Sequence, residues 1–112
     1  MLTIELSDKF KDVIAPCLKD SIMGSAFRGT ASASKRVVDD YSVLVTWIPL
    51  GARAEVKIVI KKNNEDEMIY SMLVDDYQTE LVAHVIRTWA VTFEMHCDSA
   101  IRSVRRKSAF DK

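Results

Sequence analysis

The segment from Asp75 to about Lys107 has the pattern of one long amphipathic helix, and no other feature limits the fold of this chain as much. Its apolar residues recur every three or four positions over about six turns. They are Val82, Val85, Ile86, Trp89, Phe93, Cys97, Ala100, Ile101 and Val104. Charged and polar residues occupy the opposite side, so the apolar stripe needs a broad partner such as the face of a β-sheet.

Three segments with strand-like patterns precede this helix directly. Tyr41–Ile48 is rich in β-branched and aromatic residues, and a turn at Pro49–Ala52 follows it. Ala54–Lys62 alternates apolar and polar side chains, which is typical of a half-buried strand. The pair Asn63-Asn64 predicts a second turn, because asparagine tolerates left-handed backbone conformations, and Met68–Val74 predicts the third strand. These segments indicate an antiparallel meander.

The amino-terminal part predicts a strand and then a helix. Leu2, Ile4 and Leu6 alternate with polar residues, as in a short edge strand, and Ser7 stands where a helix N-cap would stand. The apolar residues that follow recur at helical spacing: Phe10, Val13, Ile14, Cys17, Leu18 and Ile22. Pro16 lies inside this helix, where it removes a hydrogen bond, so a kink or a break into two short helices is expected.

The stretch from about residue 24 to about residue 36 is small and polar, with two glycines and no usable periodicity, so it predicts a flexible loop. Arg28, Lys35 and Arg36 lie among its serines and glycines. These cations could hold an anion or a partner, or the segment could be a plain connector.

Together these elements predict a single α+β domain over residues 1–112. The expected order is β-α-β-β-β-α, with an antiparallel three-stranded meander, an optional fourth strand at its N-terminal edge, and the long C-terminal helix packed on it. The first helix shares the face of the long helix or covers the other face. Because the first and third strands of the meander are apolar on both faces, the second face needs the first helix or another protein chain. A frayed basic terminus is expected after about residue 107.

Composition and charge limit the possible functions. The chain has 48% hydrophobic and 29% charged residues, and its 16 basic residues balance its 16 acidic ones. This balance argues against a nucleic-acid coat protein and against an acidic mimic of DNA. The charges are unevenly spread, because Asn63–Leu81 contains six acidic and no basic residues. An acidic band therefore lies between two basic ones.

The chain is expected to be cytoplasmic, without a membrane partner. No apolar run is long enough to span a bilayer, and no secretory signal is evident. Cys17 and Cys97 are then expected to be reduced, buried thiols rather than a disulfide.

Few residues have the spacing that catalysis or metal binding needs. His84 and His96 are about three helical turns apart, so they cannot share a metal ion within one molecule. Cys97 lies on the apolar stripe of the helix and is expected to be inert. The doublets Asp39-Asp40 and Asp75-Asp76 flank strands at opposite ends of the meander. The chain is therefore expected to contain no catalytic, metal or cofactor site.

A basic cluster lies at the end of the long helix: Arg102, Arg105, Arg106 and Lys107. Positive charge is favourable at the negative end of the helix dipole, so a solvated helix terminus explains the cluster. The alternative is a phosphate-binding patch that includes three lysines of the meander, Lys57, Lys61 and Lys62.

In the order helix, three strands, helix, the predicted topology is similar to that of double-stranded-RNA-binding domains. The basic entry to the second helix of that family is replaced here by Asp75-Asp76-Tyr77-Gln78. The resemblance covers topology and carries no functional residue to this chain. Nucleic acid, if bound, is expected at the basic helix end and at Arg28, Lys35 and Arg36, through phosphate contacts with little sequence preference.

The leading hypothesis is a non-enzymatic protein-binding module, of interaction or inhibitor type, that acts as a homo-oligomer. It presents its second sheet face or its serine-rich loop to a protein partner. The first alternative is a nucleic-acid-binding protein that uses the serine-rich loop and the basic end of the long helix. The second alternative is a small enzyme in which the carboxylate doublets or His84 converge in a pocket.

Overall fold

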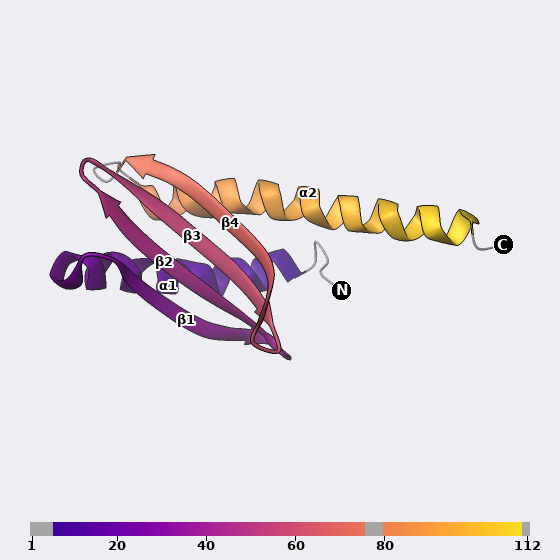
Figure 1. Ribbon diagram of the computed structural model, residues 1–112, viewed down its shortest axis with the longest axis horizontal. Coiled ribbons are helices and arrows are strands. Elements are labelled where there is room, and N and C mark those ends of the chain that lie inside the picture. Colours follow the sequence, from indigo (N-terminus) through magenta and orange to yellow (C-terminus); the bar gives the residue numbers. More distant parts are fainter. Residues whose placement is uncertain (1–5, 76–79, 111–112) are drawn as a thin grey trace.

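Two helices flank four strands along the chain (Figure 1). The computed structural model describes residues 6–75 and 80–110, and it describes side chains for residues 6–26, 29–75 and 80–97. The elements are α1 (Ser7–Arg28), β1 (Ala31–Val38), β2 (Tyr41–Leu50), β3 (Arg53–Lys62), β4 (Glu65–Asp75) and α2 (Leu81–Phe110). The class is α+β, as the sequence predicts, and the order is α-β-β-β-β-α.

The four strands form one antiparallel sheet in the order β1-β2-β3-β4. A tight turn joins each strand to the next, and each turn contains left-handed backbone: Asp39 has a φ of 50°, Gly51 of 77°, Asn63 of 53° and Asn64 of 65°. Two consecutive left-handed residues match the twist of a hairpin, which explains the asparagine pair between β3 and β4. The predicted meander is confirmed, with four strands instead of three.

The predicted loop at about residues 24 to 36 is wrong. α1 continues to Arg28, and Ala31–Val38 is the first strand. The small residues here allow a close contact between helix and strand, since a Cβ atom added at Gly24 would lie 3.1 Å from the Cβ of Ala31. In β1 half-buried alanines alternate with exposed serines. Because both types are small, this alternation carries little hydrophobic contrast.

The helix boundaries also differ from the prediction. Pro16 lies inside α1 without breaking it into two helices. α2 begins at Leu81 rather than at Asp75, because β4 continues to Asp75. The N-terminal strand predicted at residues 2–6 falls, except for Leu6, outside the described residues. With four strands, the sheet departs from the three-stranded topology of double-stranded-RNA-binding domains.

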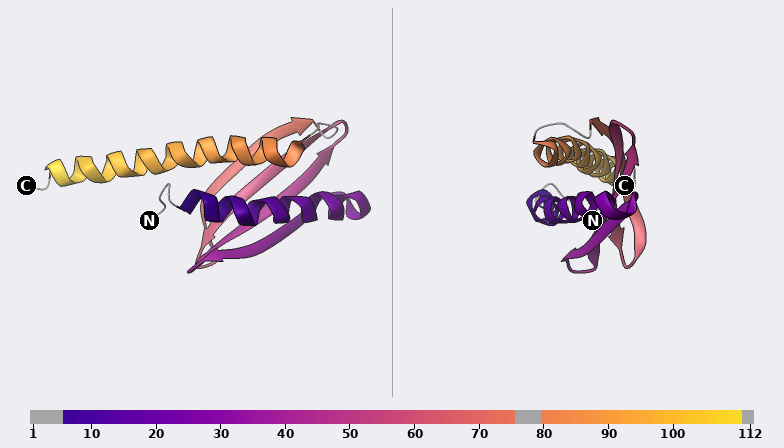
Figure 2. Two further views of the ribbon diagram at one scale, coloured as in Figure 1. Left: turned by 180° about the vertical axis from the view of Figure 1, so that it is seen from behind. Right: turned by 90° about the vertical axis from the view of Figure 1, so that its left-hand side faces the viewer.

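Both helices lie on the same face of the sheet, which gives a two-layer structure (Figure 2). α1 packs on β1 and β2, and α2 lies beside α1 on the β4 side. The C-terminal half of α2 projects past the sheet (Figure 1), and the molecule measures 58 × 24 × 20 Å along its principal axes. This helix runs to Phe110, beyond the fraying expected after about residue 107. Neither helix covers the other face of the sheet.

The core lies between the helices and the inner face of the sheet. Alternate residues of β2 and β3 point into it and are buried: Tyr41, Val43, Val45, Trp47, Ala54, Val56, Ile58 and Ile60. The ring centroid of Phe10, in α1, lies 6.0 Å from that of Tyr41, 6.2 Å from that of Trp89 and 5.5 Å from that of Phe93. Trp89 and Phe93 stack at 4.9 Å. Phe10 thus joins α1 to β2 and to α2.

Replacing Phe10 by alanine should lower the free energy of unfolding by about 3 to 5 kcal/mol, because it leaves a cavity where three elements meet. Chemical denaturation followed by circular dichroism measures the change. Val91 is exposed on α2 and provides the control, since Val91→Ala should change the free energy by less than about 0.5 kcal/mol. Similar losses of unfolding free energy in the two variants would contradict the conclusion that Phe10 joins α1 to β2 and α2.

Candidate interaction surface

We call the sheet face opposite the helices the outer face, and neither helix nor any other described element covers it (Figure 2). Its side chains follow from the strand register, since residues paired across neighbouring strands point to the same side. One row across the sheet consists of Ser34, Leu44, Val59 and Ile69. The next rows consist of Ser32, Thr46, Lys57 and Ser71, and of Ile48, Glu55 and Leu73.

Six apolar side chains gather on the outer face. Leu44, Ile48 and Val59 are half-buried, whereas Leu50 of β2 is 53% exposed, and Ile69 and Leu73 of β4 are 61% and 56% exposed. An antiparallel sheet with one solvated face normally carries polar residues on that face. Apolar residues at these positions, on strands whose inner side chains already form the core, give a surface suited to contact with another protein.

Several polar groups of the outer face are paired with each other. Ser71 Oγ donates a hydrogen bond of 2.8 Å to Glu55 Oε1. Two ion pairs lie near the ends of the strands, Lys61–Asp66 at 3.6 Å and Arg53–Asp75 at 3.5 Å. Lys57, between these ends, enters none of the ion pairs that the described side chains form. Because exposed pairs contribute little to stability, their main effect is to fix where the charges lie.

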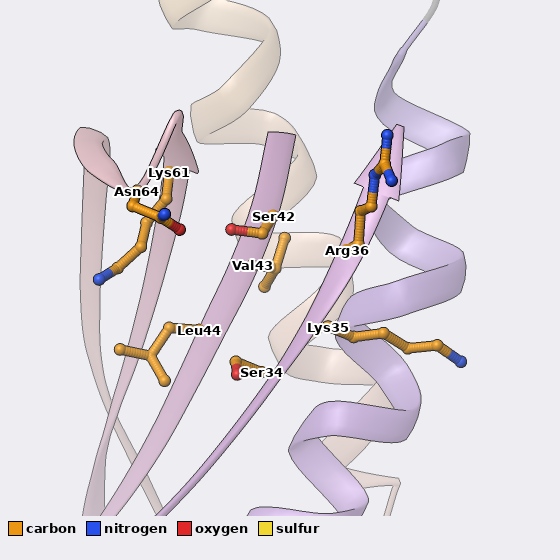
Figure 3. Close-up of a pocket in the computed structure, with 8 residues that line it drawn as sticks. All are labelled: Ser34, Lys35, Arg36, Ser42, Val43, Leu44, Lys61 and Asn64. Atoms are coloured by element: carbon orange, nitrogen blue, oxygen red, sulfur yellow. The ribbon is translucent and has the colours of Figure 1, made fainter. Parts of the chain in front are cut away.

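A hollow of about 390 Å³ opens at one end of the outer face (Figure 3). Its lining consists of Ser34, Lys35, Arg36, Ser42, Val43, Leu44, Lys61 and Asn64. Lys35 extends over α1, away from Ser42 and Leu44, and Lys61 points toward the opposite side. Arg36 Nε donates a hydrogen bond of 2.7 Å to the backbone carbonyl of Asp39. The charged ends of these side chains therefore lie around the rim of the hollow and do not converge on one point.

The structure brings together only part of the predicted basic site. Lys35 and Arg36 lie on β1 instead of in a loop, and Lys61 lines the same hollow from β3. The strand register places Arg36 and Lys61 in one row, on either side of Ser42. The side chains of the other predicted cations lie outside the described ones: Arg28, Arg102, Arg105, Arg106 and Lys107. The sequence pattern of β1 does not identify it as a strand, so it could not predict that Arg36 and Lys61 lie in the same row of the sheet.

A second hollow, which we call the β4–α2 groove, separates β4 from α2. It has a volume of about 320 Å³, and its lining consists of Ile69, Tyr70, Ser71, Met72, Thr88, Trp89, Thr92 and His96. The Tyr70 hydroxyl lies 3.2 Å from Met68 Sδ and 3.2 Å from His96 Nδ1, so it joins the strand to the helix. Burial raises the pKa of this hydroxyl, and the nearby Cys97 adds to the effect. The sequence carries no signal for the groove, because its walls come from distant segments.

The described members of the two aspartate doublets considered for catalysis lie at opposite ends of the sheet. The Asp39-Asp40 pair forms the turn between β1 and β2, whereas Asp75 ends β4 at the opposite end of the sheet, and Asp76 lies outside the described residues. Cys17 and Cys97 are buried, and burial raises the pKa of the Cys17 thiol. Within the described residues, no cluster of three or more histidine, cysteine or acidic side chains is arranged to hold a metal ion.

The chain matches no protein-family model, no curated protein and no solved structure. In the part of the chain that the structure describes, neither helix is both long and apolar enough to cross a membrane. The outer face and the β4–α2 groove are therefore the features from which a function can be inferred.

Tyr70→Phe should make the stability of the protein less sensitive to alkaline pH. A phenol whose pKa is raised by folding stabilises the fold fully below its ordinary pKa of about 10, and this contribution is lost as the pH rises further. The free energy of unfolding should therefore fall more steeply above about pH 10 in the unmodified protein than in Tyr70→Phe. Urea denaturation at several pH values measures both slopes, and parallel slopes would contradict the raised pKa.

Proposed function

We propose that this protein is a non-enzymatic protein-binding module that self-associates through its outer face. The observation that carries the proposal is one apolar set that neither helix covers: Leu44, Ile48, Leu50, Val59, Ile69 and Leu73. An apolar sheet face favours aggregation unless another chain covers it. The sheet of a second copy could pack on it at a distance of about 10 Å, as the two sheets of a β-sandwich do.

The charges near the centre of the outer face also favour a second copy. Lys57 and Glu55 are two positions apart on β3, so both point to the outer face. A twofold axis that runs across the strands between them would set Lys57 of each copy opposite Glu55 of the other. A twofold interface needs such self-complementarity, and opposite charges fix the register of the association.

Val59→Lys should abolish self-association, because it places a charge in the apolar row between Leu44 and Ile69. Sedimentation velocity and light scattering at about 1 to 100 μM measure the molar mass. We expect a dimer for the unmodified protein and a folded monomer for the variant. Val91→Lys makes the same change at an exposed position of α2 and should leave the dimer intact. An unmodified protein that is monomeric over this whole range would contradict self-association.

Nucleic-acid binding is the second candidate function, and the distribution of cations on the outer face favours it. Four basic residues point to this side of the sheet: Arg36, Arg53, Lys57 and Lys61. Phosphate contacts from such residues give binding with little sequence preference and a steep dependence on salt.

Under this second proposal, the double variant Lys57→Gln, Lys61→Gln should weaken binding to labelled RNA and DNA of mixed sequence. The slope of log K against log salt should fall by about two, because two phosphate contacts are lost. Fluorescence anisotropy at low and at physiological salt measures both quantities. Lys9→Gln, Lys19→Gln removes two exposed charges from α1 and is the control. No binding at either salt would remove this candidate.

A further inference from the structure

We propose that the free edge of β4 and the β4–α2 groove bind an extended segment of a partner protein, which adds to the sheet as a fifth, antiparallel strand. This segment alternates apolar with polar side chains and carries basic residues at its carboxyl-terminal end. The inference rests on the proposed protein-binding function and names the class of partner, but it does not depend on self-association.

The two edges of the sheet differ in their protection. An edge strand presents unpaired backbone N–H and C=O groups, and lysines or short length commonly guard it against added strands. β1, at one edge, has 8 residues and carries the exposed cations Lys35 and Arg36. β4, at the other edge, has 11 residues, and its stretch Met68–Val74 contains no charged residue. The edge of β4 is therefore the one open to strand addition.

A strand added to β4 would contact apolar side chains toward the outer face and a groove of mixed polar and apolar residues toward the helices. Toward the outer face, Ile69 and Leu73 are exposed beside it. Toward the helices, the groove lies between β4 and one flank of α2, whose lining residues are four apart: Thr88, Thr92 and His96. Met95, three residues after Thr92, extends the same flank and is 65% exposed. Alternate side chains of the added strand would enter the groove.

The two threonines in the α2 wall of the groove need no further polar partners, whereas the indole Nε1 of Trp89 in the same wall is buried without a hydrogen-bond partner among the described residues. Thr88 Oγ1 donates a hydrogen bond of 3.0 Å to the carbonyl of His84, and Thr92 Oγ1 donates one of 3.3 Å to the carbonyl of Thr88. These hydroxyls are satisfied by the helix backbone, so burying them behind an apolar side chain leaves no donor without an acceptor. The part of the groove beside Thr88 and Thr92 therefore suits apolar side chains.

The charges at the start of β4 set the direction in which the segment runs. Glu65 and Glu67 are exposed at the start of β4, and they enter none of the ion pairs among the described side chains. The carboxyl-terminal end of an antiparallel partner lies beside the start of β4. Basic residues at that end would face these two carboxylates, which gives a favourable cross-strand pairing of charges.

The same charges disfavour β4 of a second copy as the occupant. An antiparallel pairing of two β4 strands centred on Tyr70 would set Glu65 of each copy opposite Asp75 of the other. Like charges directly opposite each other destabilise a strand pair. In this register, a segment with cations where β4 has anions is therefore a better occupant than a second β4.

A random peptide library displayed on phage, with inserts of about twelve residues to match β4, provides the first test. Selection on the full chain should enrich peptides that alternate apolar and polar residues and end in lysine or arginine. Thr92→Trp fills the groove and should weaken binding of a selected synthetic peptide by at least about tenfold. Glu94→Trp puts the same ring on the other flank of α2 and should bind as the unmodified protein does. No enrichment, or equal binding by these two variants, would overturn the proposal.

A charge-reversed variant tests the predicted polarity without touching the groove. Glu65→Lys, Glu67→Lys should weaken binding of the selected peptide by about tenfold. Asp12→Lys, Asp20→Lys makes the same change in net charge on α1 and should have no effect. Hydrogen exchange should show that the peptide protects the amides of β4 and leaves those of β1 unchanged. Protection of β1 instead, or equal weakening by the two charge variants, would also overturn the proposal.

The tests of peptide binding and of self-association can fail independently of each other. A monomeric protein that binds the selected peptide along β4 would leave this inference in place and remove self-association. A dimer that Val59→Lys disrupts, together with a selection that enriches no peptide, would support self-association and remove this inference.

Discussion

Phe10 holds the two layers of this protein together, since its ring lies between Tyr41 of β2 and the stacked Trp89 and Phe93 of α2. A buried ring must be enclosed at close-packed density, so α1 and α2 lie next to each other on one side of the sheet. The opposite side then keeps an apolar row centred on Val59 that neither helix covers. The candidate interaction surface is thus a consequence of how the core is packed, and no special sequence motif marks it.

The fold could be predicted from the sequence where the two sides of an element differ strongly. β3 alternates apolar with mainly charged residues and is recognised near its observed bounds, and the continuous apolar stripe of α2 identifies the helix but not its first residue. β1 is missed because alanine and serine differ little in hydrophobicity, and the close approach of Gly24 to Ala31 exists only in three dimensions. The sequence also did not decide which face of the sheet α1 covers, because β2 and β4 carry apolar residues such as Leu44 and Ile69 on their second faces as well.

The candidate sites were less predictable than the fold, because they join residues that are distant in the chain. Tyr70 and His96 are 26 positions apart and meet only because α2 runs back along β4. Arg36 and Lys61 share a face through the strand between them. The acidic band of residues 63–81 is visible in the sequence, but its meaning depends on the sheet order, which puts Glu65 and Glu67 at the start of an edge strand.

The length of α2 has a hydrodynamic consequence. This helix contains 30 residues and is about 45 Å long, and the whole molecule is 58 Å long but only 24 and 20 Å across. A body of these proportions rotates quickly about its long axis and slowly end over end, and its friction in water exceeds that of a sphere of the same mass. A single copy should therefore elute from a gel-filtration column earlier than a compact protein of the same mass. Early elution alone would then indicate the projecting helix and would not show that a second chain is present.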